Sequence, residues 1–291
     1  MSLIQINGKT RRAPLDDAMS QDESPKLNDA VLNAYKPDAI AARIEDAGVA
    51  KAGLPLVPLV TLSILAGVFI AFGAMFFTLV TTDSGLGFGP NRLLGGVAFS
   101  LGLILVVVAG AELFTGNNLI VMAWADGKIG FPALLRNWVI VYAGNLIGAL
   151  LAAIAVYLSG TLEMAGGAVG ANALAIAKAK ISLSPGEAFV RAVLCNALVC
   201  LAVWLSYAAR RVSGKILAII FPISAFVALG LEHSIANMYF LPLGNLLDSA
   251  VTMGAIARNL FYVTVGNIAG GSVCVALVYW VASRMHRGDG G

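Results

Sequence analysis

The chain has 291 residues, of which 59% are hydrophobic and 12% are charged, and its mean hydropathy is +0.85. This composition is too apolar for a soluble domain that must keep its surface in water, so it excludes the soluble enzyme classes and indicates an integral membrane protein. The net charge is only +3, and Lys and Arg are spread along loop edges rather than massed, so no nucleic-acid partner is expected.

The N-terminal region is the polar part of the chain. Residues 1–36 carry both signs of charge without apolar periodicity, which predicts a disordered cytoplasmic tail rather than a cleaved signal peptide. In residues 37–52, Ile40, Ile44 and Val49 recur at near-helical spacing among charged residues. That pattern predicts a short amphipathic helix on the cytoplasmic face.

Six apolar runs follow, each with the roughly 20 residues that a helix needs to cross a hydrocarbon core. They are predicted to form a six-span channel domain over residues 53–284, with a cytoplasmic C-terminal tail at 285–291. Lys and Arg concentrate in the N-terminal tail, after the second and fourth runs, and at the C-terminal end, so the positive-inside rule places both termini in the cytoplasm. The expected spans are 55–80, 93–124, 134–158, 187–207, 216–240 and 256–283.

The three cysteines, Cys195, Cys200 and Cys274, lie in apolar runs without metal-ligand spacing. Their odd number and apolar surroundings favour plain packing roles. No metal site and no cofactor are therefore expected.

An internal repeat divides the membrane part into two halves. The segment G-A-E-L-F-T-G-N at 110–117 and the segment G-L-E-H-S-I-A-N at 230–237 share the pattern G-x-E-x(4)-N, at a constant spacing of 120 residues. G-N-L-I-G at 144–148 and G-N-I-A-G at 266–270 follow in the same order. Because each half has three spans, the second half starts on the opposite side of the membrane. The sequence thus predicts two inverted repeats with broken second and fifth spans and a pathway at their interface.

Each break carries a Glu and an Asn in an otherwise apolar span. Glu112 and Glu232 are costly at that depth, and we expect them to accept hydrogen bonds from backbone N–H groups that leave helical geometry, with direct substrate contact as the alternative. Asn117 and Asn237 are expected to cap the half-helices that restart there. Broken spans also point helix N-termini into the membrane, which favours an anion as the permeant.

His233 is the sharpest functional candidate, because it is the only histidine in a predicted span and His286 lies in the C-terminal tail. An ionisable side chain at a membrane break is a functional residue by default, here as a proton donor or a local positive field. Asn145 and Asn267 lie in the two G-N-x-x-G segments, where close helix packing is the favoured role and pore lining the alternative.

Four segments together resemble the formate/nitrite transporter family, and most of all its bacterial formate channels. They are G-A-E-L-F-T-G-N-N-L, C-N-A-L-V-C-L-A-V-W-L-S-Y, F-V-A-L-G-L-E-H-S-I-A-N-M and V-G-N-I-A-G-G, and the resemblance covers about residues 37–284. It implies an all-α homopentamer of aquaporin-like protomers in the bacterial inner membrane. Different members pass formate, nitrite, hydrosulfide, acetate or lactate.

The resemblance also implies roles for individual residues. Thr115 and His233 form the central pair, and Asn196, Asn267 and Lys180 are polar pore positions, Lys180 in the outer vestibule. The residues that match the gate and its narrow apolar constrictions are Phe99, Leu103, Leu113, Phe114 and Phe226.

The expected function is passive or proton-linked transport of a small weak-acid anion, most simply formate, with protons as a second partner. A bare charge is disfavoured at apolar constrictions, so the anion is expected to take a proton near His233 and cross as the neutral acid. Nitrite or hydrosulfide transport and a structural membrane subunit are the alternatives. The sequence does not contain the paired N-P-A segments that are typical of an aquaporin-type channel. It also lacks the G-x-S-x-G segment expected of an enzyme that uses Ser234 beside His233, so no enzyme is expected.

Overall fold

A computed structural model describes residues 34–288, and the regular structure of that part is helical throughout. Residues 1–33 and 289–291, which include most of the predicted N-terminal tail and the end of the C-terminal tail, lie outside the described residues. The elements are α2 (Pro37–Ala52), α3 (Leu56–Thr81), α4 (Phe88–Ile104), η1 (Leu105–Gly110), η2 (Gly116–Ile120), α5 (Val121–Ala125), α6 (Phe131–Leu158), η3 (Thr161–Gly167), α7 (Ala168–Ile181), α8 (Pro185–Ala208), α9 (Val212–Ala228), α10 (Ser234–Leu247), α11 (Met253–Ile268), η4 (Ala269–Leu277) and α12 (Val278–Gly288).

Five helical segments of the described part are long and apolar enough to cross a membrane, and α9 is a shorter apolar helix. The five are Leu56–Thr81, Phe88–Gly110, Pro185–Ala208, Phe131–Leu158 and Met253–Met285. Two of the six predicted runs, 93–124 and 216–240, are interrupted, because the chain leaves helical geometry after Gly110 and after Ala228. Gly110 and Gly230 have φ of 85° and 69°, a left-handed conformation that ends a helix and that only glycine adopts without strain.

Helix α7 was not predicted, since residues 159–186 were expected to be loop. Its 14 residues are too few to span a bilayer, so a search for long apolar runs passes over it. Its many alanines give high helix propensity, and Val169, Ala173 and Ala177 are buried. The helix packs against α10 and brings Lys180, near its C-terminus, toward the second break.

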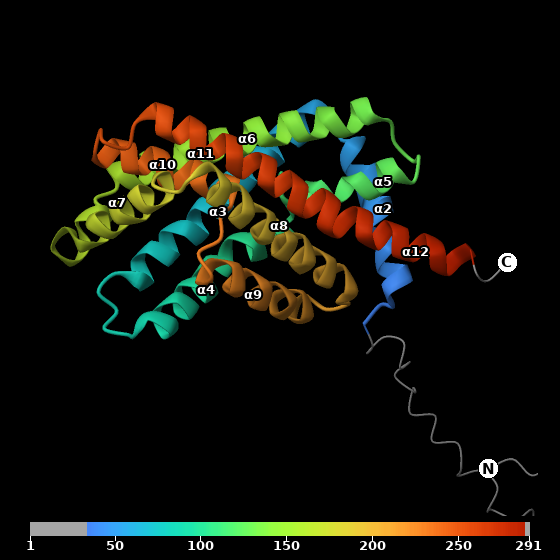
Figure 1. Cartoon of the computed structure of the whole chain (residues 1–291), viewed down its shortest axis with the longest axis horizontal. Helices are drawn as coiled ribbons and strands as arrows, with labels where there is room; N and C mark the ends of the chain where they lie inside the picture. Colours follow the sequence, from blue (N-terminus) through green and yellow to red (C-terminus); the bar gives the residue numbers. More distant parts are fainter. Residues whose placement is uncertain (1–33, 289–291) are drawn as a thin grey trace, which may run out of the picture. The chain divides into compact units, whose positions relative to one another are not determined.

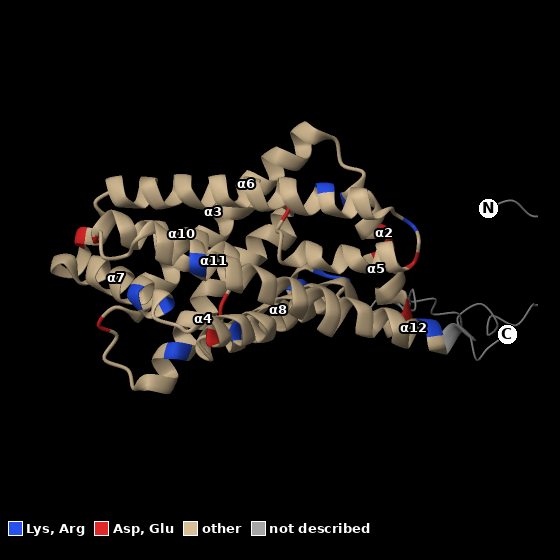
Figure 2. Ribbon diagram, turned by 45° about the horizontal axis from the view of Figure 1, so that its top comes forward, with Lys and Arg blue, Asp and Glu red and all other residues tan. Residues whose placement is uncertain are grey.

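The helices form two triplets with the same contacts. Helix α3 packs against α4 and α6, and α8 packs against α9 and α11, while α4 against α9 joins the triplets. Figure 1 shows α7 and α10 at one end of the bundle and α2 and α5 at the other end. In Figure 2, charged residues are sparse along the long helices and occur mainly toward the ends and near the interrupted segments.

The G-N-x-x-G segments pack as predicted. A Cβ at Gly148 would lie 2.0 Å from the Ile64 carbonyl oxygen, and one at Gly270 would lie 2.1 Å from the Val193 carbonyl oxygen. Side chains larger than hydrogen are excluded there, so α6 approaches α3, and the start of η4 approaches α8, almost backbone to backbone.

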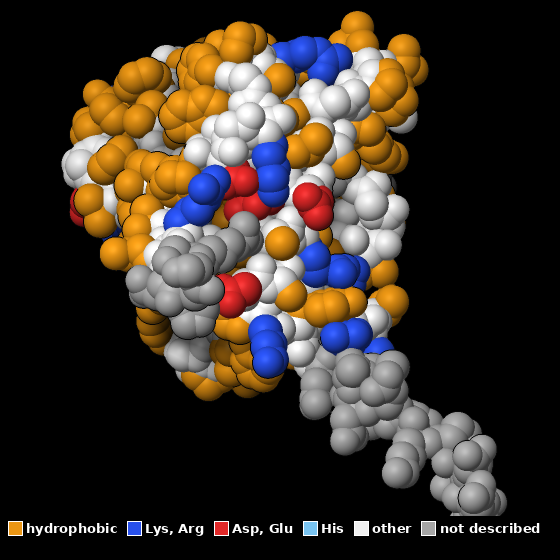
Figure 3. Space-filling model, turned by 90° about the vertical axis from the view of Figure 1, so that its right-hand side faces the viewer, with side chains coloured by type: hydrophobic (Ala, Val, Ile, Leu, Met, Phe, Trp, Pro, Cys, Tyr) orange, Lys and Arg blue, Asp and Glu red, His pale blue; other side chains and the backbone are white. Residues whose placement is uncertain are grey.

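Helix α2 lies against the end of the bundle that carries η2, α5 and α12. Ile40 and Ile44 are buried as the apolar spacing suggests, but Val49 is 38% exposed, and Gly48 takes the contact position against Ala123 instead. Figure 3 shows this end face, where Lys, Arg, Asp and Glu side chains gather in the middle and hydrophobic side chains surround them. A charged end with apolar flanks is the surface expected of a bundle that stands across a bilayer.

Candidate functional site

At the first break, residues 111–115, the carboxylate of Glu112 is buried and paired. Its Oε1 accepts from Lys51 Nζ at 2.6 Å and its Oε2 accepts from Asn117 Nδ2 at 2.7 Å. Asn117 Nδ2 also donates to Asn137 Oδ1 at 3.0 Å, and Asn137 Nδ2 donates to the Lys51 carbonyl at 3.1 Å. The four side chains form one closed network.

The second break, residues 229–233, repeats this network. Glu232 accepts from Lys180 Nζ at 2.9 Å and from Asn237 Nδ2 at 2.7 Å. Asn237 Nδ2 donates to Asn259 Oδ1 at 2.8 Å, and Asn259 Nδ2 donates to the Lys180 carbonyl at 3.0 Å. Each lysine comes from a short helix outside the apolar runs, α2 for Lys51 and α7 for Lys180.

Two sequence predictions about these residues are wrong. Glu112 and Glu232 bind side chains of Lys and Asn, not backbone N–H groups. Asn237 lies inside α10 and does not cap it. Asn117 does not act as a cap either, because its amide nitrogen donates to Glu112 and Asn137. The reason is that the buried carboxylate is satisfied better by a cation and an amide than by N–H groups that can bond elsewhere.

The backbone at the breaks is held by Asn145 and Asn267. Asn145 Oδ1 accepts from Phe114 N at 2.9 Å, and its Nδ2 donates to the Ser63 and Glu112 carbonyls at 2.7 and 2.9 Å. Asn267 makes the same three contacts, with Ser234 N at 2.8 Å and with the Ala192 and Glu232 carbonyls at 2.8 and 2.9 Å. These amides supply the partners that a non-helical backbone needs inside a membrane.

The two breaks meet at Thr115 and His233. Thr115 Oγ1 lies 3.0 Å from His233 Nε2, and the two residues are 0% and 2% exposed. His233 is also the N-cap of α10, because its Nδ1 accepts from Ala236 N at 3.1 Å. An acceptor nitrogen carries no proton, so the neutral ring has its proton on Nε2 and donates it to Thr115.

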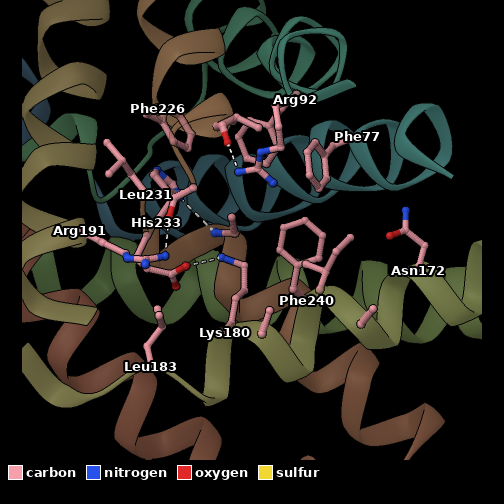
Figure 4. A pocket seen from close by; sticks show the side chains of 18 residues that line it. Phe77, Arg92, Asn172, Lys180, Leu183, Arg191, Phe226, Leu231, His233 and Phe240 are labelled. Carbon is pink, nitrogen blue, oxygen red and sulfur yellow. Dashed lines mark hydrogen bonds and ion pairs between the residues drawn. The ribbon is translucent and has the colours of Figure 1, made fainter. Parts of the chain in front are cut away.

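A cavity lies on each side of this pair. The α7 cavity, about 340 Å³, is lined by Phe99, Phe226, Lys180 and His233 among others (Figure 4). The α2 cavity, about 430 Å³, includes Lys51, Leu103 and Leu113 in its lining. In the α7 cavity the rings of Phe99 and Phe226 meet edge to face at 5.5 Å, and Phe226 stacks on His233 at 5.9 Å.

Four predicted pore residues lie outside both cavity linings, namely Thr115, Phe114, Asn196 and Asn267. Phe114 is buried against Trp138 and Tyr142, with ring centroids 6.0 and 5.0 Å away. Asn196 Nδ2 donates to the Thr115 and Asn267 carbonyls, and the Asn267 amide is engaged as described. A contact of these side chains with a permeant stays a prediction, while their present contacts hold Thr115 and the breaks in place.

Sequence reasoning missed three residues that complete the site, Lys51, Asn137 and Asn259. It also missed that Asn145 binds the backbone of the first break. Lys51 was interpreted as a marker of membrane orientation, since its carboxylate partner is 61 residues away in the chain. A usable signal was present for Asn145, because it recurs as Asn267 in the repeat.

An ion-pair chain fixes the middle of α2. Lys128 Nζ lies 2.6 Å from Glu45 Oε2 and 3.4 Å from Asp126 Oδ2, and Asp126 also pairs with Arg284 of α12. The hydrogen bond to Glu45 raises the pKa of Lys128, and the hydrogen bond from Arg284 lowers the pKa of Asp126. Helix α2 is therefore tied near its C-terminal end to the first break and at its middle to α12.

Comparison with known proteins gives consistent matches along most of the chain. Residues 38–281 match the model of the formate/nitrite transporter family. The formate channel FocA of Escherichia coli (strain K12) is 42% identical over 265 residues, covering 84% of this chain and 93% of that protein. A solved pentameric formate channel with formate bound has a TM-score of 0.73 at 38% identity, covering 78% of this chain and 97% of that one. An FNT family ion channel has a TM-score of 0.76 at 29% identity, with coverages of 84% and 98%.

Proposed function

Because the chain belongs to the formate/nitrite transporter family, and is thus a multi-pass membrane transporter rather than an enzyme, we propose that formate crosses it between the α7 and α2 cavities, past Thr115 and His233. The observation that carries this route is the 3.0 Å contact between Thr115 Oγ1 and His233 Nε2, since it lies between two cation-lined cavities. The permeant would take the place of this contact and receive a hydrogen bond from each side chain.

The proposed architecture has six spans, with α9 and α10 together as the fifth, in two inverted three-helix repeats. The matching networks at the two breaks and the placement of α7 and α2 at opposite ends support it (Figure 1). The α7 end would be the outer side, with both termini in the cytoplasm and residues 37–52 on the cytoplasmic face of the bacterial inner membrane.

We also propose a homopentamer, as in the solved formate channel to which the chain is similar. Large apolar side chains exposed along several helices fit burial by lipid and by neighbouring protomers. They include Phe72 and Phe76 of α3, Val139 and Leu151 of α6, and Phe221 of α9.

We propose that His233 transfers the proton, in an order that its hydrogen bonds suggest. The neutral ring donates from Nε2, and a second proton adds at Nδ1 only if the N-cap bond from Ala236 N, worth about 1 kcal/mol, is given up, in addition to the cost of charging a buried ring. The imidazolium then passes its Nε2 proton to a carboxylate oxygen of the anion, which leaves a neutral ring protonated on Nδ1. The neutral acid then crosses the apolar residues ahead of it without the desolvation cost of a charge; these are Leu103 and Leu113 on the way to the α2 cavity and Phe99 and Phe226 on the way to the α7 cavity.

The test is flux through purified protein in liposomes. Formate flux is expected to exceed that of empty liposomes and to rise with an inward proton gradient, and His233→Ala should lower it about tenfold or more. Unchanged flux in His233→Ala would remove the ring from the mechanism.

The same liposomes separate the alternatives. A panel of formate, nitrite and hydrosulfide ranks the permeants, and a higher flux of nitrite or hydrosulfide would replace formate as the substrate. No flux of any solute would favour a structural membrane subunit.

A further inference from the structure

Two arginines from different helices reach the turn of the second break. Arg92 of α4 donates from Nε to the Ala228 carbonyl at 3.1 Å and from Nη2 to the Val227 carbonyl at 2.5 Å. Arg191 of α8 donates from Nη1 to the Gly230 carbonyl at 3.3 Å. Figure 4 shows both side chains at the α7 cavity, Arg191 near His233 and Arg92 near Phe77.

The two guanidinium groups both reach Gly230. From the position that a Cβ would take at Gly230, Arg92 Nη2 is 3.2 Å away and Arg191 Nη1 is 3.9 Å away, so these two nitrogens are at most about 7 Å apart. Like charges within that distance in a half-buried place repel each other, and a counter-charge between them relieves the repulsion.

No carboxylate of residues 34–288 lies within 4 Å of either arginine's nitrogens. The acidic residues nearest in sequence to Arg191 and to the turn, Glu187 and Glu232, have other partners. Glu232 binds Lys180 and Asn237, and Glu187 accepts from the N and Oγ of Ser184. No described carboxylate therefore pairs directly with either arginine, and the coulombic attraction between Arg191 and Glu187, one turn away on α8, compensates the positive charge of the pair only in part.

The pair also keeps donors for a ligand. A guanidinium has five N–H groups, and the carbonyls of the turn use two on Arg92 and one on Arg191. The remaining N–H groups offer the fork that binds two oxygens of a carboxylate or of nitrite at once, a geometry that a single-centre anion cannot use.

The first break has no equivalent. No side chain of the described residues donates to the carbonyls at 107–110, where η1 ends, and the cations that join Lys51 in the α2 cavity are Arg43 and Lys215, from α2 and α9. The pair thus belongs to one side of the pathway only.

We propose that Arg92 and Arg191 form a binding site for a two-oxygen anion, a carboxylate or nitrite, on the α7 side of the Phe99–Phe226 constriction. The site rests on the proposed function in that it would load the pore from that side. The site takes the role of binding the anion in the outer vestibule, which was expected of Lys180, because the Lys180 ammonium is held by Glu232 at 2.9 Å. It also discriminates against hydrosulfide, because hydrosulfide has only one acceptor atom.

The decisive variant is Arg191→Gln, because Arg191 makes a single long bond to the turn, so its loss disturbs the backbone little. The half-saturating formate concentration for flux into liposomes should rise about fivefold or more, while the limiting flux stays within about twofold and hydrosulfide flux is unchanged. Lys178→Gln is the matched control, since Lys178 is on α7 but pairs with Asp248 at 2.7 Å and does not line the cavity. Equal half-saturation in Arg191→Gln and Lys178→Gln would overturn the site.

A binding measurement separates this inference from the transport proposal. Saturation-transfer NMR of formate on detergent-solubilised protein should show weaker binding in Arg191→Gln and in Arg92→Lys, which keeps the charge but loses the fork. If wild-type protein carries no formate but Arg191→Gln still weakens binding, the proposed function fails and the site stands. If wild-type protein carries formate and both variants bind it as wild type does, the site fails and the proposed function stands.

Discussion

The first and second breaks have the same framework and different contents. Glu112 and Glu232 each bind one lysine and one asparagine, and Asn145 and Asn267 each hold three backbone groups. Beside the glutamates, however, the first break has Leu113 where the second has His233. The second break continues into the 14-residue α10, capped by His233, whereas the first continues into a short η2 and a five-residue α5.

This difference teaches which parts of the site are structural necessities. Any chain that leaves helical geometry inside a bilayer has to satisfy its N–H and C=O groups and any buried carboxylate, so both halves carry the same Glu, Lys and Asn groups. The residues with freedom to differ are those that face the cavities and the centre. Thr115, His233 and the arginine pair are all of this second kind.

The largest effect is expected when the backbone of a break loses its amide. Asn145→Leu or Asn267→Leu removes a hydrogen bond from one N–H and from two carbonyls, at about 1–3 kcal/mol for each group left without a partner, and should lower the Tm of the detergent-solubilised protein by on the order of 10 °C. Fluorescence-detected unfolding measures this.

Asn172→Leu is the control for that comparison. Asn172 Nδ2 also has three acceptors, among them the Thr78 carbonyl at 2.9 Å, but the residue is half-buried and water can replace them. If Asn172→Leu lowered the Tm as much as Asn267→Leu, the amides of the breaks would have no special structural role.

A smaller effect is expected when a break glutamate loses its lysine. Lys180→Met leaves Glu232 as an uncompensated buried charge and should cost about 2–3 kcal/mol of stability. Lys51→Met should cost less, because Lys51 is 28% exposed against 14% for Lys180 and water replaces it more easily.

Rescue tests this interpretation. Lys180→Met combined with Glu232→Gln removes both charges and should recover most of the lost Tm, as should Lys51→Met with Glu112→Gln. A double variant no more stable than its single lysine variant would show that the lysines act through packing rather than charge.

The smallest effect concerns the ion pairs at the two ends of the bundle. Hydrogen bonds from Arg284 and Lys178 are the main causes that lower the pKa of Asp126 and of Asp248. A lowered carboxyl pKa stabilises the fold above the unfolded value of about 4, and this contribution is lost as the pH falls through the folded value. Asp126→Asn should therefore lower the Tm by about 1–3 °C at pH 7. The difference in Tm between the wild type and Asp126→Asn should disappear at pH 3.

Asp248→Asn should have the same Tm as the wild type at either pH, because the Asp248 and Lys178 side chains are 33% and 49% exposed and solvent screens their charges. A larger difference in Tm for Asp248→Asn than for Asp126→Asn would reverse the predicted order of the two ends.

Local sequence was sufficient for the features that depend on composition and spacing. The apolar runs follow from hydropathy, the two breaks from Gly, Glu and Asn in repeated positions, and the close helix contacts from Gly144, Gly148, Gly266 and Gly270. The pairing of Thr115 with His233 was expected from family resemblance, and the structure brings the two side chains to 3.0 Å.

Only the tertiary structure decided which partners the polar groups take. Lys51 and Glu112 are 61 residues apart, and Arg92 and the Val227 carbonyl are 135 apart, so no local pattern links them. Helix α7 is too short to be recognised by hydropathy, yet it positions Lys180 at Glu232. The physical reason is common to these cases: a buried polar group must be satisfied, but the fold determines which of several possible donors lies within reach. The sequence thus determined that two of the apolar spans are interrupted by matched polar segments. The packing of α2, α4, α7 and α8 around these segments determined how the two breaks differ.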